Sequence, residues 1–580
     1  MQDIREDTVP GVSPSRGTRI GAWWRARFGQ PISITGVLVA TLFFIGSLTP
    51  SLIPRGYLSQ GLLSGVCLGV GYALGVLLRW FWRYLQLREL PRSRRLEHWP
   101  TLLGAVSLIA ILAAAWLVRP WQDSVRQVMG MAPIDETFTL RLVLIAFATF
   151  AVLLMLGRAF LWIARGAARR ARRLMPARIA NALGVFAAAL LFFFIANGVV
   201  LRGALHLIDA SFRQADAMIP ADRQPPVSPT ATGGPGSLVA WQELGRTGRD
   251  FVDSGPSAED IGKFTGAGAM TPIRVYVGLP AAPDARERAR LALRELQRQG
   301  GFSRSVLVVI TPTGSGWVDP AAADSLEYLL HGDVASVAIQ YSYLSSPLSL
   351  MIEPDYGEES ARALFAEIYG YWRTLPKDRR PRLYLQGLSL GAMNSERSLD
   401  FFDMIDDPIN GALWSGPPFA SRHWRALTQA RNAGTPEWLP QYREGRFVRF
   451  INQHGGPVAD NATWGPMRVV YLQYASDAIT FFDPHDAWRA PDWMAAPRGP
   501  DVSPELRWYP LVTMIQLALD MLLADGTPMG YGHVFAPSHY LSAWRMVLGV
   551  QDWREQDLAR LQQQMDAQRR QAIAQRRGDL

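Results

Sequence analysis

Long apolar runs dominate the first third of the chain, whereas the second half shows short apolar segments separated by polar and turn residues. Five of the runs approach the ~20 apolar residues that a membrane-spanning helix needs. They lie at about 31–53, 60–80, 101–118, 140–163 and 180–201. This pattern predicts an N-terminal α-helical transmembrane bundle of about five spans.

From about residue 273 onward, β-branched runs alternate with segments of helical periodicity. We expect strands at 273–279, 305–311, 334–341, 382–386, 410–414, 447–451 and 468–474, and helices at 284–299, 322–330, 356–372 and 508–523. Strands that alternate with helices predict crossover connections and a mainly parallel, doubly wound sheet. Ligands of such sheets bind beyond the carboxyl ends of the strands.

The 580 residues are too many for a single hydrophobic core, so several domains are expected. Residues 202–272 contain the stretch PPVSPTATGGPGS and predict a linker or a loosely packed cover. The final segment is rich in charge and predicts a solvated helix, with docking on anionic headgroups as the alternative. The expected divisions are a cytoplasmic segment 1–30, a transmembrane domain 31–201, the linker 202–272, a catalytic domain 273–550 and a charged C-terminal helix 551–580.

The net charge of +9 comes from arginines that flank the apolar runs, which indicates membrane topology and argues against nucleic acid as a partner. Arginines are concentrated before the first run, between the second and third, and between the fourth and fifth. Basic loops stay in the cytoplasm, so an odd number of crossings predicts an extracytoplasmic, periplasmic domain after residue 201, held in the inner (plasma) membrane. The single cysteine, Cys67, excludes a disulfide and a cysteine metal site. We expect no metal and no cofactor.

Ser389 lies in the sequence RLYLQGLSLGAM, between Gly387 and Gly391. A GxSxG match alone is common by chance. Here an apolar strand pattern precedes it and a helical pattern, AMNSERSLDFFDMI, follows, which is the setting of a nucleophile elbow. The two glycines remove Cβ atoms from a tight turn. Ser389 is therefore the candidate nucleophile, and an ordinary serine in a glycine-rich loop is the alternative.

A serine hydroxyl becomes nucleophilic when an imidazole takes its proton and a carboxylate orients that imidazole. The expected chain order is serine, acid, histidine. Asp477 follows an apolar run at an expected strand end, and His533 lies in a glycine-containing loop before the last helix of the domain. The alternatives are Asp483 and Asp486 for the acid and His539 for the base.

The oxyanion that forms during acyl transfer needs two backbone N–H donors. One is expected from Leu390, directly after the nucleophile, and the other from the loop TPTGSGWVD, with Gly314 and Ser315 as the leading candidates. A phosphate-binding loop for a nucleotide is not favoured, since neither GxGxxG nor a P-loop lysine follows.

Several long stretches resemble the bacterial α/β-hydrolase family whose members carry an N-terminal multi-pass membrane domain, formerly a family of unknown function. They are SLTPSLIPRG, PIRVYVGL, TPTGSGWVDP, LEYLLHGDVASVAIQYSYLSSPLSL, RPRLYLQGLSLGA, YLQYASDAITFF and GYGHVFAPSHYLSAW. The resemblance implies Ser389 as nucleophile, with Asp477 and a histidine of GYGHVF completing the triad. Relatives often carry an acidic residue where this chain has Leu388.

Together these features predict a membrane-anchored serine hydrolase, esterase- or lipase-like, that forms an acyl-enzyme from a lipid or lipid-linked ester outside the cytoplasm. A transacylase would use the same mechanism. The alternative from another class is a non-catalytic transport or scaffold protein whose hydrolase-like domain binds a ligand. The sequence predicts contact with a bilayer and leaves the substrate and the oligomeric state undetermined.

Overall fold

The computed structural model describes residues 32–87, 98–135, 137–195, 197, 214, 216–219, 223–344, 346, 348–349, 355–457 and 462–578. The expected cytoplasmic segment 1–30 lies outside these residues. The chain divides into two compact units. The first, which we call the helical unit, comprises Met1–Leu48, Arg55–Arg119 and Asp135–Leu205. The second comprises Thr49–Pro54, Pro120–Ile134 and His206–Leu580, and we call it the catalytic unit after the catalytic domain that the sequence predicts within it.

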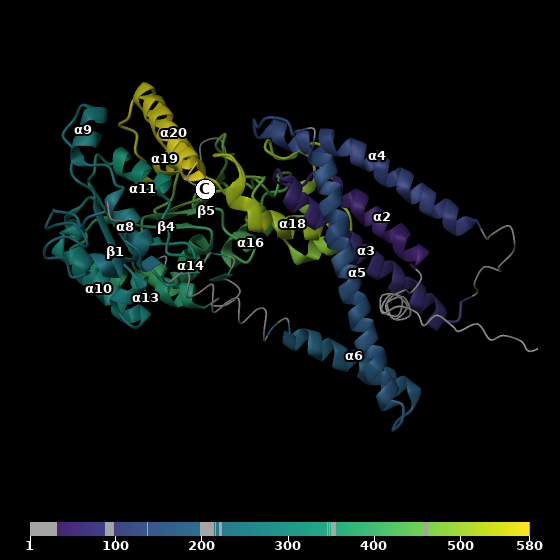
Figure 1. The fold of residues 1–580 in the computed structure, drawn as a ribbon. Coiled ribbons are helices and arrows are strands. Elements are labelled where there is room, and N and C mark those ends of the chain that lie inside the picture. The colour runs from purple at the N-terminus through teal and green to yellow at the C-terminus, as the bar shows by residue number, and fades with distance from the viewer. Residues whose placement is uncertain are drawn as a thin grey trace, which may run out of the picture. The chain divides into compact units, whose positions relative to one another are not determined.

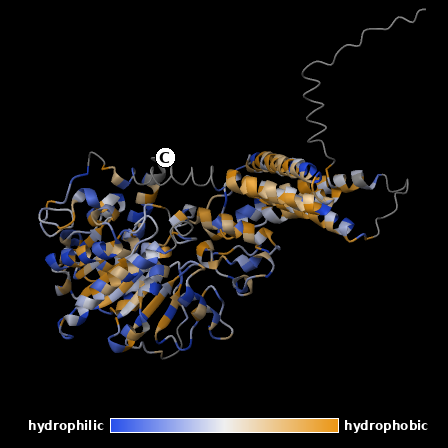
Figure 2. Cartoon of the chain, turned by 90° about the horizontal axis from the view of Figure 1, so that it is seen from below, coloured by the Kyte–Doolittle hydropathy of each residue, from blue (hydrophilic) through white to orange (hydrophobic). Residues whose placement is uncertain are grey.

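Five helices follow the five apolar runs of the sequence (Figure 1). They are α2 (Ile34–Leu48), α3 (Tyr57–Tyr84), α4 (Trp99–Val128), α5 (Phe138–Ala171) and α6 (Ala177–Phe194). Four of them are long and apolar enough to cross a membrane, namely α3, α5, α6 and the Thr101–Val128 part of α4. Apolar residues dominate this part of the chain in Figure 2.

The first helix is shorter than the sequence pattern suggests. Its 15 residues span about 22 Å, whereas a bilayer core is about 30 Å thick. The helix ends at Leu48 because Pro50 disfavours helical backbone at the residue before it and lacks an N–H group. The described residues therefore contain four candidate spans and one shorter apolar helix, where about five spans were expected.

The catalytic unit contains a seven-stranded sheet in the order β1-β3-β2-β4-β5-β7-β6, with every neighbouring pair parallel. All seven strands were predicted, and the parallel sheet confirms the predicted fold class. Both faces are covered by helices, so the strands read as nearly continuous apolar runs. The strands are β1 (Ile273–Val277), β2 (Val306–Thr311), β3 (Val334–Ile339), β4 (Arg382–Leu388), β5 (Gly411–Ser415), β6 (Val448–Ile451) and β7 (Arg468–Leu472).

Two groups of helices cover the two faces of the sheet (Figure 1). One group is α10 (Ala285–Arg298), α13 (Tyr356–Thr374) and α14 (Leu390–Ser398), and the other is α11 (Pro320–Leu329), α19 (Pro537–Leu548) and α20 (Glu555–Gly578). This arrangement is the expected doubly wound architecture. The remaining α-helices of the unit are α8 (Gly245–Asp253), α9 (Ala258–Thr265), α15 (Phe401–Asp406), α16 (Arg422–Gln429), α17 (Ala478–Phe481) and α18 (Val512–Leu523).

The segment after Ser389 forms two helices where one was expected. The chain leaves α14 at Leu399, and Asp400 starts α15 by accepting a hydrogen bond from the backbone N–H of Phe402 at 2.8 Å. An aspartate that caps a new helix competes with continuation of the previous one.

Residues 241–265 belong to the compact unit, although the sequence predicts a linker or cover there. Trp241, Leu244, Phe251 and Ile261 are buried in the same hydrophobic core as the sheet. Helix α8 packs against β1. The few apolar residues of this segment are spaced so that each short helix buries one side. The overall composition of the segment, rich in Pro, Gly, Ser and Thr, does not reveal this spacing.

Two connections between the apolar helices are also part of the catalytic unit. In the first, the backbone N–H of Leu52 donates to Oδ2 of Asp520 at 3.1 Å, and Ser51 donates to the same oxygen. In the second, Ser124 and Ser503 share a hydrogen bond of 2.7 Å between their hydroxyl oxygens. Leu52, Ile53, Val125 and Met129 are buried in the core of the unit.

Candidate active site

Ser389 stands at the turn from β4 into α14 with φ of 57° and ψ of −123°. A non-glycine residue rarely adopts positive φ, because its Cβ atom then crowds the backbone. The turn is held by a hydrogen bond from the backbone N–H of Ser389 to the carbonyl oxygen of Ser415 at 2.9 Å. This is the strained strand–turn–helix geometry of a nucleophile elbow.

Both glycines of the motif lie at close backbone contacts. A Cβ atom on Gly387 would stand 2.4 Å from the carbonyl oxygen of Gly391, and one on Gly391 would stand 2.2 Å from the carbonyl oxygen of Thr311. The elbow therefore fits against β2 only because neither position carries a side chain.

His533 and Asp477 form a buried hydrogen-bonded pair. Nδ1 of His533 lies 2.7 Å from Oδ2 of Asp477, and the two side chains are 5 % and 0 % exposed. The other carboxylate oxygen of Asp477 accepts from the backbone N–H of Ile479 at 2.9 Å, which fixes its orientation at the start of α17. Nε2 of His533 is buried and has no hydrogen-bond partner among the described residues.

The environment of His533 acts on its pKa in two directions. Burial alone would lower the pKa of this imidazole, but the charge of Asp477 and the hydrogen bond to it outweigh burial and raise the pKa above its ordinary value. With Nδ1–H held by the carboxylate, the neutral ring presents an unpaired Nε2 that can accept a proton.

Ser389 and His533 line one cavity of about 780 Å³. Both lie near the carboxyl ends of β4 and β5: a Cβ atom added to Gly416 would stand 2.6 Å from Cε1 of His533, and Gly416 follows Ser415, whose carbonyl oxygen accepts from the N–H of Ser389. The structure thus brings Ser389, His533 and Asp477 to one edge of the sheet.

The expected oxyanion donors differ in their present partners. The N–H of Gly314 donates to Oγ of Ser346 at 3.1 Å, so it is already engaged. Ser315, from the same loop, lines the cavity. Leu390 is the first residue of α14, where a backbone N–H has no partner within the helix.

The alternative acid and base residues lie elsewhere. Asp483 hydrogen-bonds His485 at 2.6 Å, and Asp483 and Asp486 line a separate pocket that contains neither Ser389 nor His533. Nδ1 of His539 lies 2.5 Å from the hydroxyl oxygen of Tyr474, and burial lowers the pKa of His539 to about 4. Its partner is therefore a tyrosine and not a carboxylate.

Helix α20 contributes to the cavity, which the sequence analysis missed. Arg569 lines the cavity and pairs with the buried carboxylate of Asp319 at 3.2 Å. Leu558, Leu561 and Met565 are buried on the same helix. These residues are spaced by three and four positions, and Arg569 follows four positions later, so all four lie on one face of the helix. This spacing indicates a buried face, and the expectation of a solvated helix was wrong for this side of α20.

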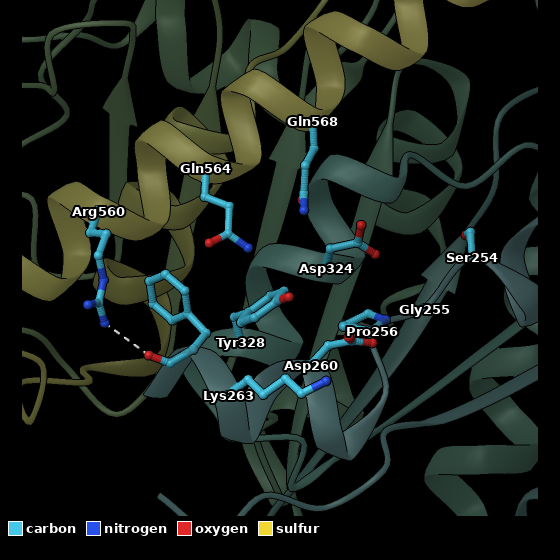
Figure 3. Close-up of a pocket in the computed structure, with 11 residues that line it drawn as sticks. Ser254, Gly255, Pro256, Asp260, Lys263, Asp324, Tyr328, Arg560, Gln564 and Gln568 are labelled. Atoms are coloured by element: carbon cyan, nitrogen blue, oxygen red, sulfur yellow. Dashed lines mark hydrogen bonds between the residues drawn. The ribbon is translucent and has the colours of Figure 1, made fainter. Parts of the chain in front are cut away.

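A further pocket of about 630 Å³ is lined by residues of α9, α11 and α20 and contains neither Ser389 nor His533 (Figure 3). Asp324 on its wall pairs with the buried Arg274 at 2.6 Å, and Arg274 also binds Glu327 at 2.7 Å. At the other end, Arg560 donates to the carbonyl oxygen of Phe264 at 2.9 Å. Arg274, Asp324 and Glu327 thus satisfy one another, whereas Arg560 is bonded to a backbone carbonyl.

Comparison with known proteins gives two matches. A family model described as "Alpha/beta-hydrolase family" matches residues 273–561, and a second described as "Alpha/beta-hydrolase family N-terminus" matches residues 48–256. The first match contains the sheet, Ser389, Asp477 and His533. No curated protein and no solved structure matches the chain.

The close contact at Gly391 gives a testable outcome. Gly391→Ala should lower the midpoint of thermal unfolding, by an amount that corresponds to about 1–3 kcal/mol, because the added methyl group meets backbone atoms that cannot move freely. Gly370→Ala is the matched control, since nothing lies within 4 Å of a Cβ atom there. In the helix α13 the control should stabilise by up to about 1 kcal/mol. Equal effects of the two substitutions would contradict the packing described for the elbow.

Proposed function

Because the chain belongs to the alpha/beta-hydrolase family, we propose that it is a membrane-anchored serine hydrolase that cleaves a lipid or lipid-linked ester through an acyl-enzyme. One observation carries this proposal. A serine on a strained turn shares a cavity with a histidine whose Nδ1 is bound to a buried aspartate and whose Nε2 is unpaired among the described residues.

The proposed roles follow from these positions. Oγ of Ser389 attacks the carbonyl carbon of the ester while Nε2 of His533 takes the hydroxyl proton, and Asp477 stabilises the resulting imidazolium. The oxyanion receives hydrogen bonds from the N–H groups of Leu390 and Ser315. Collapse of the tetrahedral intermediate transfers the proton from His533 to the leaving alcohol and leaves an acyl group on Ser389. Water, activated by His533, then releases the acid.

A lipid substrate is supported by the apolar part of the cavity wall. Met521 and Leu522 from α18 and Ile573 from α20 line it. Among the described residues, four helices apolar enough to span a membrane precede the sheet in the chain. If a second hydroxyl group entered in place of water, the same acyl-enzyme would give a transacylase.

The proposed sidedness rests on connectivity. Both Thr49–Pro54 and Pro120–Ile134 belong to the catalytic unit; in the chain, α3 begins shortly after the first segment, α4 ends within the second, and α5 begins shortly after it. The arginine-rich connections lie at the opposite ends of the helices, and such connections stay in the cytoplasm. We propose that the catalytic unit faces the periplasm from the inner membrane.

A fluorophosphonate probe tests the nucleophile. The wild-type protein should be labelled and Ser389→Ala should not be, because the probe reacts with an activated serine oxygen. Ser398→Ala, a substitution in the same helix α14, should leave labelling unchanged. A folded wild-type protein that stays unlabelled would favour a non-catalytic transport or scaffold protein with a ligand-binding hydrolase-like domain.

The histidine–aspartate pair sets the expected pH dependence. Asp477 favours the charged imidazolium and raises the pKa of His533, whereas catalysis needs the neutral base, so activity should fall as pH drops through a pKa above 6.5. Asp477→Asn should move this acidic limb to lower pH and reduce kcat by about 10⁴-fold. Asp483→Asn should change neither quantity. An unshifted limb in Asp477→Asn would assign the titration to another group.

Labelling of single cysteines tests the sidedness. In a Cys67→Ser background, a membrane-impermeant maleimide applied to spheroplasts should modify Arg379→Cys, whose native side chain is 83 % exposed on the catalytic unit. It should modify Leu174→Cys, between α5 and α6, only after permeabilisation. The reverse pattern would place the catalytic unit in the cytoplasm.

A further inference from the structure

One side of the cavity carries three arginines. Of the residues that line it, Arg246, Arg249 and Asp250 lie on α8, and Arg223 pairs with Asp250. This leaves the guanidinium groups of Arg246 and Arg249 without an ion-pair partner in the described part of the chain. We call these two residues the α8 arginine pair.

Arg249 is an unusual wall residue, because a fully buried guanidinium normally has all of its N–H groups bonded. Its Nη2 donates to the carbonyl oxygens of Asp216 and Met218, each at 2.8 Å. Its Nε and Nη1 are buried and have no partner among the described residues. A charge that is desolvated and only half bonded is costly. Arg249 has no exposed surface in this conformation, so an anion in the cavity would supply the missing acceptors after a small movement of the side chains that cover Nε and Nη1.

The neighbouring carboxylates do not accept hydrogen bonds from Nε or Nη1 of Arg249. The carboxylate of Asp216 lies near Arg249 but receives its hydrogen bonds from the backbone N–H of Arg246 and the amide of Gln340. Asp319 is paired with Arg569. Asp525 is exposed, and its charge acts on His533.

Helix α8 also contacts the loop of the proposed oxyanion site. The hydroxyl of Thr247, between the two arginines in sequence, donates to the carbonyl oxygen of Ser315 at 3.4 Å. The arginine pair therefore sits beside the reaction centre, while Met521 and Leu522 line the cavity from α18.

We infer that the α8 arginine pair binds a phosphate group on the alcohol part of the substrate, so that the substrate class is an acyl ester of a phosphate-bearing alcohol. This assignment rests on the proposed function and extends it. A phosphate offers several acceptor oxygens and up to two charges, which suits two guanidinium groups on successive turns of one helix better than a neutral hydroxyl does. The acyl chain would then lie along the apolar wall.

Binding to the full chain in non-ionic detergent tests this inference without turnover, in a Ser389→Ala background. The probes are a short-chain acylglycerol phosphate, the neutral monoacylglycerol with the same chain, its hemisuccinate ester and inorganic phosphate. We expect the acylglycerol phosphate to bind about tenfold or more tightly than the neutral compound, with a preference that weakens as salt is added.

Arg246→Gln should reduce binding of the acylglycerol phosphate about tenfold and leave the neutral compound unchanged. Its exposed side chain makes loss of folding an inadequate explanation. Arg249→Gln should have at least the same effect, and its thermal unfolding reports any loss of the bonds to Asp216 and Met218. Arg379→Gln, on the surface, is the matched control for net charge.

Three results would overturn the inference. They are equal binding of the phosphate and neutral compounds, tighter binding of the hemisuccinate, and inorganic phosphate that binds as tightly as the acylglycerol phosphate. Fluorophosphonate labelling separates this inference from the proposed function. Labelled protein without phosphate preference overturns the inference alone, and unlabelled protein with phosphate preference overturns the hydrolase and keeps the phosphate site.

Discussion

The backbone at Ser389 is the constraint on which the rest of the site depends. A residue with φ of 57° between a buried strand and a helix is stable only if the surrounding atoms hold it there. Ser415 accepts its N–H, and Gly391 lies against the carbonyl of Thr311. These contacts come from the strands on either side of β4, so the pairing of β2, β4 and β5 fixes the direction of the serine hydroxyl.

The same pairing organises the remaining groups. Thr311 ends β2 and leads into the loop that carries Ser315, so the contact at Gly391 also sets the distance between the elbow and this loop. On the other side, Gly416 donates its N–H to Leu472 at the end of β7, and Asp477 follows a few residues later. The elbow follows β4, Gly416 beside the imidazole follows β5, and Asp477 follows β7. These three strands are neighbours, so the groups lie together at the carboxyl edge of the parallel sheet, as expected.

Sequence patterns predicted what depends on local order. Buried parallel strands are continuous apolar runs, and the elbow requires glycines at fixed positions around Ser389, so the sequence predicted both. The sequence did not predict groups whose environment depends on tertiary packing. In the sequence Arg249 looks like any charged residue of a short helix, and only the fold shows that it is buried and bonded to the carbonyl oxygens of Asp216 and Met218. Arg569 was missed for a different reason. The many charged residues of α20 led to the prediction of a solvated helix, although the apolar residues of this helix recur at three- and four-residue intervals.

The connection Thr49–Pro54, between α2 and α3, is bonded to a helix that forms part of the cavity wall. Asp520 is fully buried on α18 and accepts hydrogen bonds from Ser51 and Leu52, while the next two residues of α18 line the cavity. The cavity wall is therefore fixed by a segment that lies about 470 residues earlier in the chain. Removing it would take away two hydrogen-bond donors of a buried carboxylate and open the space that Leu52 fills in the core. A domain cut at residue 273 is thus incomplete, and two connections between the apolar helices are structural parts of the catalytic unit.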